Sequence, residues 1–200
     1  MSYVVPLGHP YWYVRSIAER YGDEITCFHL SYYEYIPQSL VDKRRTFTVG
    51  CDLFQDDRFV AEFLRNVPAG QEVAFHSNVL LRSGEELHIP MIDMSTSSSA
   101  QLTKLRPFMG DYLFETFSWY RSGRSFHGYG GQLLAAREWS ALLGTLLLAN
   151  QRGLPPTVDP RWIGHRLVSG YAALRWTKNT WHYIALPEAL DWQKSVEHHR

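Results

Sequence analysis

The chain has 200 residues, with 20 Lys and Arg against 20 Asp and Glu, so its formal net charge is zero. This length suits one domain with a sizeable core, and the balanced charge excludes a strongly basic nucleic-acid-binding protein while allowing a local basic patch. The two cysteines, Cys27 and Cys51, lack the spacing of a zinc site or a disulfide framework. No apolar run reaches about 18 residues and no basic leader is visible, so we expect a single domain over residues 1–200, no membrane span and a cytoplasmic location.

The N-terminal part of the chain predicts two helices and four strands. Apolar residues at helical intervals indicate the helices, and runs rich in aromatic and β-branched residues indicate the strands. Asp56 or Asp57 is expected to cap the second helix, which Pro68 and Gly70 end. The predicted elements are a helix at 9–22, strands at 25–36 and 44–54, a helix at 56–70, and paired strands at 71–81 and 85–94.

The C-terminal part predicts hairpins around one long helix. The predicted elements are a short helix within 95–107 that stops at Pro107, a hairpin of strands 112–120 and 125–130, a helix at 132–153, a loop at 152–160, and a hairpin of strands 171–176 and 181–186. Strands that follow one another in hairpins, rather than alternating with helices, favour an α+β fold. We therefore expect a mostly antiparallel sheet flanked by helices.

Residues able to carry chemistry are concentrated in three segments. The segments are "IPMIDMS", which ends an apolar run at Asp93, "SGRSFHGYG", with Ser125 and His127 after a glycine turn, and "TVDPRWIGHRLVSGYAALRWTKNT", with Asp159, Arg166 and Arg175. Carboxylates bind hard divalent cations, while histidine and arginine donate hydrogen bonds to phosphate oxygens. A phosphoryl-transfer site needs these residue types together.

The order and surroundings of these segments resemble the archaeo-eukaryotic primase superfamily, whose catalytic core is the primase-polymerase fold. In that family an apolar strand ends in Asp-x-Asp or Asp-x-Glu, and a later strand carries Ser-x-His after a glycine-rich turn. An apolar residue followed by Asp and an arginine segment come next. The matches are "MIDMS", "SGRSFH", "TVD" and "YAALRWTKN", within about residues 86–185. The Ser-x-His motif is the most specific of the four.

The resemblance implies a primase-polymerase-like nucleotidyltransferase that uses Mg or Mn. It implies that Asp93 and Asp159 hold the metal, and that these two residues and His127 are catalytic. The residues that it implies for nucleotide binding are Ser125, His127, Arg124, Arg166, Arg175 and Lys178. The implied partners are a nucleoside triphosphate, single-stranded or primed nucleic acid, and a helicase or accessory subunit, in DNA replication or repair.

The sequence departs from the family pattern at Ser95, where the family has its second acid. A hydroxyl carries no charge and is a poor substitute for a carboxylate in a two-metal site. Side chains two apart on a strand share a face, so we expect Ser95 beside the metal with Asp93. We therefore expect one weakly bound metal and little polymerisation.

Two other interpretations stay open at this point. The chain could be a catalytically inactive primase-fold module that binds nucleic acid, a nucleotide or a partner protein, since fold and chemistry are separable. Alternatively, the motifs are coincidental in an unrelated α+β protein, with Asp93 and Asp159 as helix caps or turn residues and His127 in the core. The primase-like interpretation requires Asp93, His127 and Asp159 to converge in one cleft.

Overall fold

The computed structural model describes residues 4–190 of the chain. The strands are β1 (Ile25–Tyr33), β2 (Arg44–Gly50), β3 (Glu72–Leu81), β4 (Glu86–His88), β5 (Met91–Asp93), β6 (Phe117–Ser122), β7 (Ser125–Gly130), β8 (Leu134–Ala135), β9 (Ala173–Arg175) and β10 (Glu188–Ala189). The helices are α1 (Tyr11–Tyr21), α2 (Cys51–Gln55), α3 (Asp57–Arg65), α4 (Arg106–Met109), α5 (Asp111–Glu115), α6 (Ala136–Leu147) and α7 (Pro160–Ser169), with 3-10 helices at Gly22–Glu24 and Ser99–Leu105.

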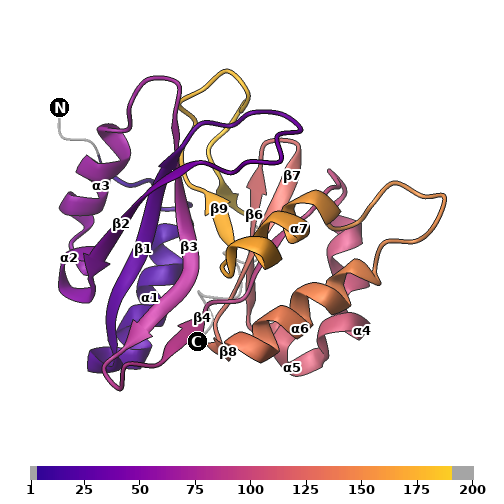
Figure 1. Ribbon diagram of the computed structural model, residues 1–200, viewed down its shortest axis with the longest axis horizontal. Coiled ribbons are helices and arrows are strands. Elements are labelled where there is room, and N and C mark those ends of the chain that lie inside the picture. The colour runs from indigo at the N-terminus through magenta and orange to yellow at the C-terminus, as the bar shows by residue number, and fades with distance from the viewer. Residues whose placement is uncertain (1–3, 191–200) are drawn as a thin grey trace.

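These strands form two sheets. The first has the order β2-β1-β3-β4-β8, with β9 also paired to β3, and the second has the order β10-β6-β7-β5. The strand pairings within both sheets are antiparallel. In Figure 1 the first sheet fills the left half of the molecule, β6 and β7 lie in the right half with α4, α5 and α6, and α7 lies between them in front. The fold is therefore α+β with antiparallel sheets flanked by helices, as the sequence predicts.

A core of aromatic and aliphatic side chains runs through the described residues and holds β9 beside β3 in the first sheet. The rings of Phe75 on β3 and Trp176, just after β9, are stacked with their centroids 4.7 Å apart and their planes 8° apart. Both side chains are fully buried, as are Tyr11 and Ile17 on α1. Burying a large ring stabilises a fold by a few kcal/mol, so this packing holds β9 firmly in place.

Several predicted elements are confirmed. The first helix, the strand that begins at Ile25 and the strand 71–81 are present, and the Asp56 carboxylate caps α3 by accepting a hydrogen bond from the Arg58 N–H at 3.0 Å. The hairpin of β6 and β7 turns at Gly123, whose φ of 73° suits glycine. The long helix is also present but shorter than predicted, because β8 precedes it and it ends at Leu147.

Three predicted strand and helix boundaries are wrong. The strand predicted at 44–54 ends at Gly50, and Cys51–Gln55 is helical, which buries Phe54 against Phe28 with ring centroids 4.3 Å apart. Residues 111–115 form α5, so the strand predicted at 112–120 begins only at Phe117. Pro107 does not stop a helix but lies in the first turn of α4, where its missing N–H has no helical partner to lose.

The strand predicted at 85–94 is two strands in different sheets. The Ile89 N–H donates to the Ser77 carbonyl of β3 at 2.7 Å, whereas the carbonyl of Pro90 accepts from the Gly130 N–H of β7 at 2.8 Å. Proline has no N–H to continue the ladder with β3, so the chain leaves the first sheet at Pro90. This crossing carries Asp93 into the second sheet.

The C-terminal hairpin predicted at 171–186 is also wrong. β9 pairs with β3 instead, and residues 181–186 form no strand. The buried Glu72 carboxylate accepts hydrogen bonds from the N–H groups of Asn179 and Thr180 and from the Thr177 hydroxyl, which bends the chain away. The helix α7 is missing from the elements that the sequence predicts after Asp159. None of the helices in residues 4–190 is both long and apolar enough to cross a membrane.

Replacing Gly128 on β7 by alanine should destabilise the fold by about 1–3 kcal/mol. An added Cβ would lie 2.6 Å from the Trp119 ring and 2.9 Å from the Phe117 ring, both in the packed core. The control is Gly144→Ala in α6, where no atom lies within 4 Å and helix propensity favours alanine. Chemical denaturation measures both changes, and equal stabilities for the two variants would contradict this account.

Candidate active site

One cleft of about 410 Å³ collects most of the predicted site residues. Its walls come from the loop between β1 and β2, the end of β5, the hairpin of β6 and β7, α7 and β9. The predicted residues that line it are Asp93, Ser125, His127, Asp159, Arg166 and Arg175. The convergence required by the primase-like interpretation is therefore present.

Backbone hydrogen bonds bring the two acidic residues of the cleft together. The Asp159 N–H donates to the Asp93 carbonyl at 2.9 Å, and the preceding Val158 forms an antiparallel bridge with Met94. On its other side, β5 pairs with β7 and places Asp93 directly opposite His127. The order of the three segments in the sheet thus positions Asp93 between His127 and Asp159.

Asp159 also caps α7. Its Oδ1 accepts hydrogen bonds from the N–H groups of Arg161, at 2.8 Å, and Trp162, at 3.0 Å. A carboxylate at this position is favoured by the unsatisfied N–H groups and by the helix dipole. The cap uses Oδ1 and fixes the carboxylate at the cleft, so the capping role and a metal-binding role are compatible.

His127 is held close to Asp93 in neutral form. Its Nε2 lies 3.7 Å from Asp93 Oδ1, and only 6% of its side chain is exposed. Burial lowers the pKa of His127 well below its usual value, and the nearby Arg175 guanidinium lowers it further. Within the described residues, its buried Nδ1 has no hydrogen-bond partner. A neutral imidazole in this position can donate one hydrogen bond to a ligand.

The carboxyl of Asp93 is unusually basic. Burial raises its pKa, the Asp159 carboxylate raises it further, and Arg175 and Arg166 oppose the shift only in part, giving a value of about 8. Two close carboxylates repel each other, and a cation between them would relieve this repulsion. This is an electrostatic environment that suits a bound metal ion.

Two buried arginines provide hydrogen-bond donors to the cleft. Arg175 is 4% exposed, and its Nη2 donates to the Ser122 hydroxyl at 2.8 Å. Arg166 on α7 is 2% exposed and donates through Nη2 to Asp42. Among residues 4–190 no partner is found for Nε of Arg175 or for Nε and Nη1 of Arg166. Unpaired buried donors are costly, so these atoms are suited to receive a ligand.

Comparison with known proteins agrees with this geometry. The sequence model of the AEP-like family, described as archaeo-eukaryotic primase 1D-like, matches residues 54–188. The chain belongs to this archaeo-eukaryotic primase 1D-like family. No curated protein and no solved structure matches it.

Three residues singled out from the sequence lie outside this cleft. Arg124, in the turn between β6 and β7, and Lys178, after β9, are exposed and do not line it. Ser95 is exposed and lines a separate cavity with Gln101 and Lys104. The expectation that Ser95 lies in the cleft with Asp93 is wrong, because Ser95 lines the separate cavity and not the cleft. The chain stays paired beyond β5, since Met94 bridges Val158 and the Ser95 N–H donates to the Thr157 carbonyl at 2.9 Å.

Other residues that line the cleft were not predicted from the sequence. Arg161 and His165 belong to the same helix as Arg166, and the sequence Asp159-Pro160 could have revealed its start, since a capping acid followed by proline is a helix N-terminal signal. Asp42 and Arg44 come from the β1–β2 loop and its edge, about 50 residues before the first motif. Nothing in the sequence connects them to the site.

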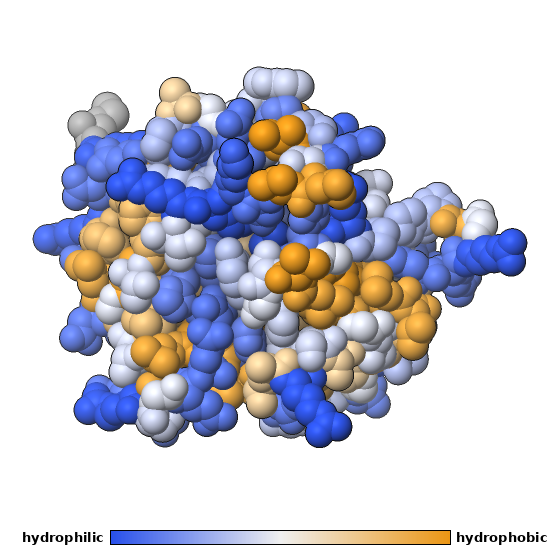
Figure 2. Space-filling view, viewed as in Figure 1, coloured by the Kyte–Doolittle hydropathy of each residue, from blue (hydrophilic) through white to orange (hydrophobic). Residues whose placement is uncertain are grey.

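Apolar surface lies on several of the elements that form or neighbour the cleft. Figure 2 shows apolar surface around the tip of the β1–β2 loop and over α6 and α7, with hydrophilic surface between these areas. Exposed apolar side chains of these elements, and of the residue that follows α6, include Ile36, Leu40, Val41, Leu148, Leu167 and Val168. Aromatic side chains next to the cleft include Tyr35, whose ring lies 5.2 Å from that of His182.

The residues of the cleft fit one metal ion better than two. Asp93 and Asp159 supply carboxylate oxygens, the ligands that Mg and Mn prefer. In the described part of the chain no group of three or more His, Cys, Asp and Glu side chains is arranged to hold a metal. Two further acids line the cleft, but two arginines already neutralise Asp42, and Glu34 is exposed on the β1–β2 loop. Two cations would repel each other without further anionic charge.

The raised pKa of Asp93 predicts a pH-dependent stability. In the unfolded chain this carboxyl ionises near pH 4, whereas the folded protein keeps the proton up to about pH 8. The folded state therefore binds more protons in this interval, and the free energy of unfolding should fall by about 1 kcal/mol between pH 7 and pH 9. Buried histidines with a lowered pKa act in the opposite direction just above pH 7, where the unfolded chain still binds some histidine protons. The fall that Asp93 causes is therefore read as the difference between the natural chain and Asp93→Asn. Denaturation of the metal-free protein measures the fall.

The Asp93→Asn variant should lose this pH dependence, because its amide does not titrate. The exposed Asp23→Asn, which removes the same charge far from burial, should keep it. An unchanged fall in Asp93→Asn would show that another group is responsible.

Proposed function

We propose that the cleft binds a nucleoside triphosphate together with one divalent cation. One observation supports this most strongly: two close carboxylates and buried, partly unpaired arginine donors line the same cleft. In a magnesium- or manganese-bound triphosphate, the cation can pair with the two carboxylates and the phosphate oxygens can accept hydrogen bonds from the arginines.

Each residue has a distinct role in this proposal. Asp93 and Asp159 hold the cation, and Arg166 and Arg175 donate hydrogen bonds to phosphate oxygens. His127, fixed opposite Asp93, donates to a third phosphate oxygen through an imidazole N–H. Ser125, at the start of β7, lines the same wall of the cleft and offers a hydroxyl.

The bound triphosphate is positioned for nucleotidyl transfer. A hydroxyl of a nucleic-acid 3′ end or of a second nucleotide attacks the α-phosphorus. A new P–O bond forms, the bond to pyrophosphate breaks and the hydroxyl proton passes to water. The metal, when bound, neutralises charge on the phosphates. A site with a single cation lacks the second charge that stabilises both attacking and leaving oxygens, so the transfer should be slow.

A second candidate is a primase-fold module that binds a nucleotide or nucleic acid without transfer. The small number of acids inside the cleft favours it, because Asp42 is engaged by Arg44 and Arg166. Glu34 is exposed on the β1–β2 loop, which leaves the Asp93 and Asp159 pair for a metal. Incorporation of nucleotides on primed and unprimed templates with Mn separates the two candidates. Activity that disappears in Asp93→Ala supports transfer, and its absence in the natural chain supports the binding module.

Binding of the nucleotide should raise the melting temperature. At a concentration about 100-fold above Kd the stabilisation is about 2.7 kcal/mol, or roughly 5–10 °C for a chain of this size. His127→Ala should remove most of this rise, because it deletes a phosphate contact, while leaving the free protein folded. The control is His29→Ala, on β1 outside the cleft. A rise that persists in His127→Ala would exclude this histidine as a phosphate contact.

Ser95→Asp should leave Mn affinity and nucleotide incorporation unchanged within about twofold. The new carboxylate would lie in the separate cavity of Ser95 rather than in the cleft, so it should not become a ligand of the metal. Asp93→Asn should weaken Mn binding in the same titration. Tighter Mn binding in Ser95→Asp would show that residue 95 does reach the metal.

A further inference from the structure

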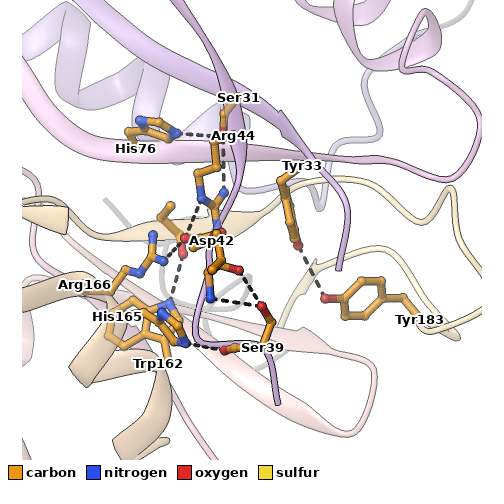
Figure 3. A network of polar contacts seen from close by, with 12 residues as sticks. Ser31, Tyr33, Ser39, Asp42, Arg44, His76, Trp162, His165, Arg166 and Tyr183 are labelled. Carbon is orange, nitrogen blue, oxygen red and sulfur yellow. Dashed lines mark hydrogen bonds and ion pairs between the residues drawn. The ribbon is translucent and has the colours of Figure 1, made fainter. Parts of the chain in front are cut away.

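The β1–β2 loop, residues 34–43, places a carboxylate between two guanidinium groups in the wall of the cleft (Figure 3). Arg44 Nε donates to Asp42 Oδ2 at 2.8 Å, and Arg166 Nη2 donates to the same oxygen. The side chains of Arg44 and Arg166 are only 9% and 3% exposed. One loop carboxylate therefore joins a strand edge to α7.

The charges of this cluster are not balanced. Two guanidinium groups face one carboxylate, which leaves one buried positive charge in excess. Arg44 makes a further bond through Nη1 to the Ser31 hydroxyl, at 3.2 Å, and His76 Nε2 lies 2.7 Å from the same hydroxyl. His76 is buried and contributes no compensating negative charge. An unpaired buried charge is costly, so this excess of positive charge favours binding of an anion at the cleft wall that both arginines line.

The hydrogen bonds are not balanced either. Nε and Nη1 of Arg166 have no partner within residues 4–190, although the residue is nearly fully buried and lines the cleft. The Asp42 carboxylate uses one oxygen for both arginines and so leaves much of their fork geometry unused. A phosphate group has more oxygens and can accept from both guanidinium groups at once.

We propose that Arg44 and Arg166 form an oxyanion site that the Asp42 carboxylate occupies in the free protein, and that a phosphate group of the ligand displaces it. This inference deepens the proposed function, since the same cleft would receive the polyphosphate of a nucleotide. The loop does not depend on Asp42 alone, because the Ser39 carbonyl accepts from Arg161 and lies 3.1 Å from His165 Nε2. Asp42 can therefore leave the arginines while the loop stays attached to α7.

The test is calorimetric binding of tripolyphosphate in EDTA, so that no metal takes part. Asp42→Asn should bind it at least about fivefold more tightly than the natural chain, the lower end of typical coupling between two ligands. Arg44→Gln should bind at least about fivefold more weakly. The control Asp23→Asn makes the same change in net charge at a fully exposed side chain and should bind as the natural chain does. Equal or weaker binding by Asp42→Asn, or an equal gain in Asp23→Asn, would overturn the proposal.

Further arms separate this proposal from the proposed function. Tripolyphosphate without metal does not require the Asp93 and Asp159 pair, so the gain from Asp42→Asn should persist in an Asp93→Asn background. Suppose that nucleotide with Mn still raises the melting temperature in a way that requires His127, but that Asp42→Asn leaves the affinity for tripolyphosphate unchanged. The oxyanion proposal then fails, and the proposed function stands. A gain seen only with a single-stranded oligonucleotide lacking terminal phosphates would assign the arginines to a nucleic-acid backbone and also overturn it. If Asp42→Asn does not fold, Arg44→Gln decides the matter, and unchanged binding refutes the proposal.

Discussion

The cleft depends on one backbone hydrogen bond, from the Asp159 N–H to the Asp93 carbonyl at 2.9 Å. This bond and the adjacent bridge between Met94 and Val158 attach the segment before α7 to the free edge of β5. They bring together two carboxylates that are far apart in the sequence and repel each other. The arrangement persists because the rest of the backbone is satisfied around it and because Asp159 caps α7. The acid pair is thus a consequence of strand pairing, and its chemistry follows from that enforced proximity.

Charge in the cleft is arranged in two groups of opposite sign. The acid pair leaves Asp93 with a raised pKa, and the arginines leave donors and a positive charge without full compensation. The arginines compensate the acid pair only in part, because Arg166 donates to Asp42 and Arg175 donates to the Ser122 hydroxyl. A ligand that carries both a cation and phosphate oxygens would complete both groups at once. Such separated, incompletely satisfied groups are costly in a purely structural core and are typical of binding sites.

The sequence predicts which residues of the motifs meet in the cleft better than it predicts the segments around them. Asp93, His127 and Asp159 are found because each lies in a short motif and the motifs keep a family order. The crossing at Pro90 is missed because an apolar run contains no sign that its two halves belong to different sheets. The C-terminal hairpin fails for a similar reason, since Glu72 holds the segment through contacts more than 100 residues apart in the chain. Asp42 and Arg44 reach the cleft only through such long-range folding, which local patterns do not record.

The position of Ser95 changes the meaning of the missing acid. If residue 95 lay beside Asp93 on the same face of a strand, its serine would mean the loss of a metal ligand that the family pattern has at this position. Here the pairing continues beyond β5 through Met94 and Ser95, yet Ser95 lines the second cavity and not the cleft. We therefore expect a carboxylate at this position to lie outside the cleft. The residues that meet in the cleft are therefore the Asp93 and Asp159 pair and the arginines around it, and the same backbone pairing that brings this pair together leaves Ser95 outside the cleft.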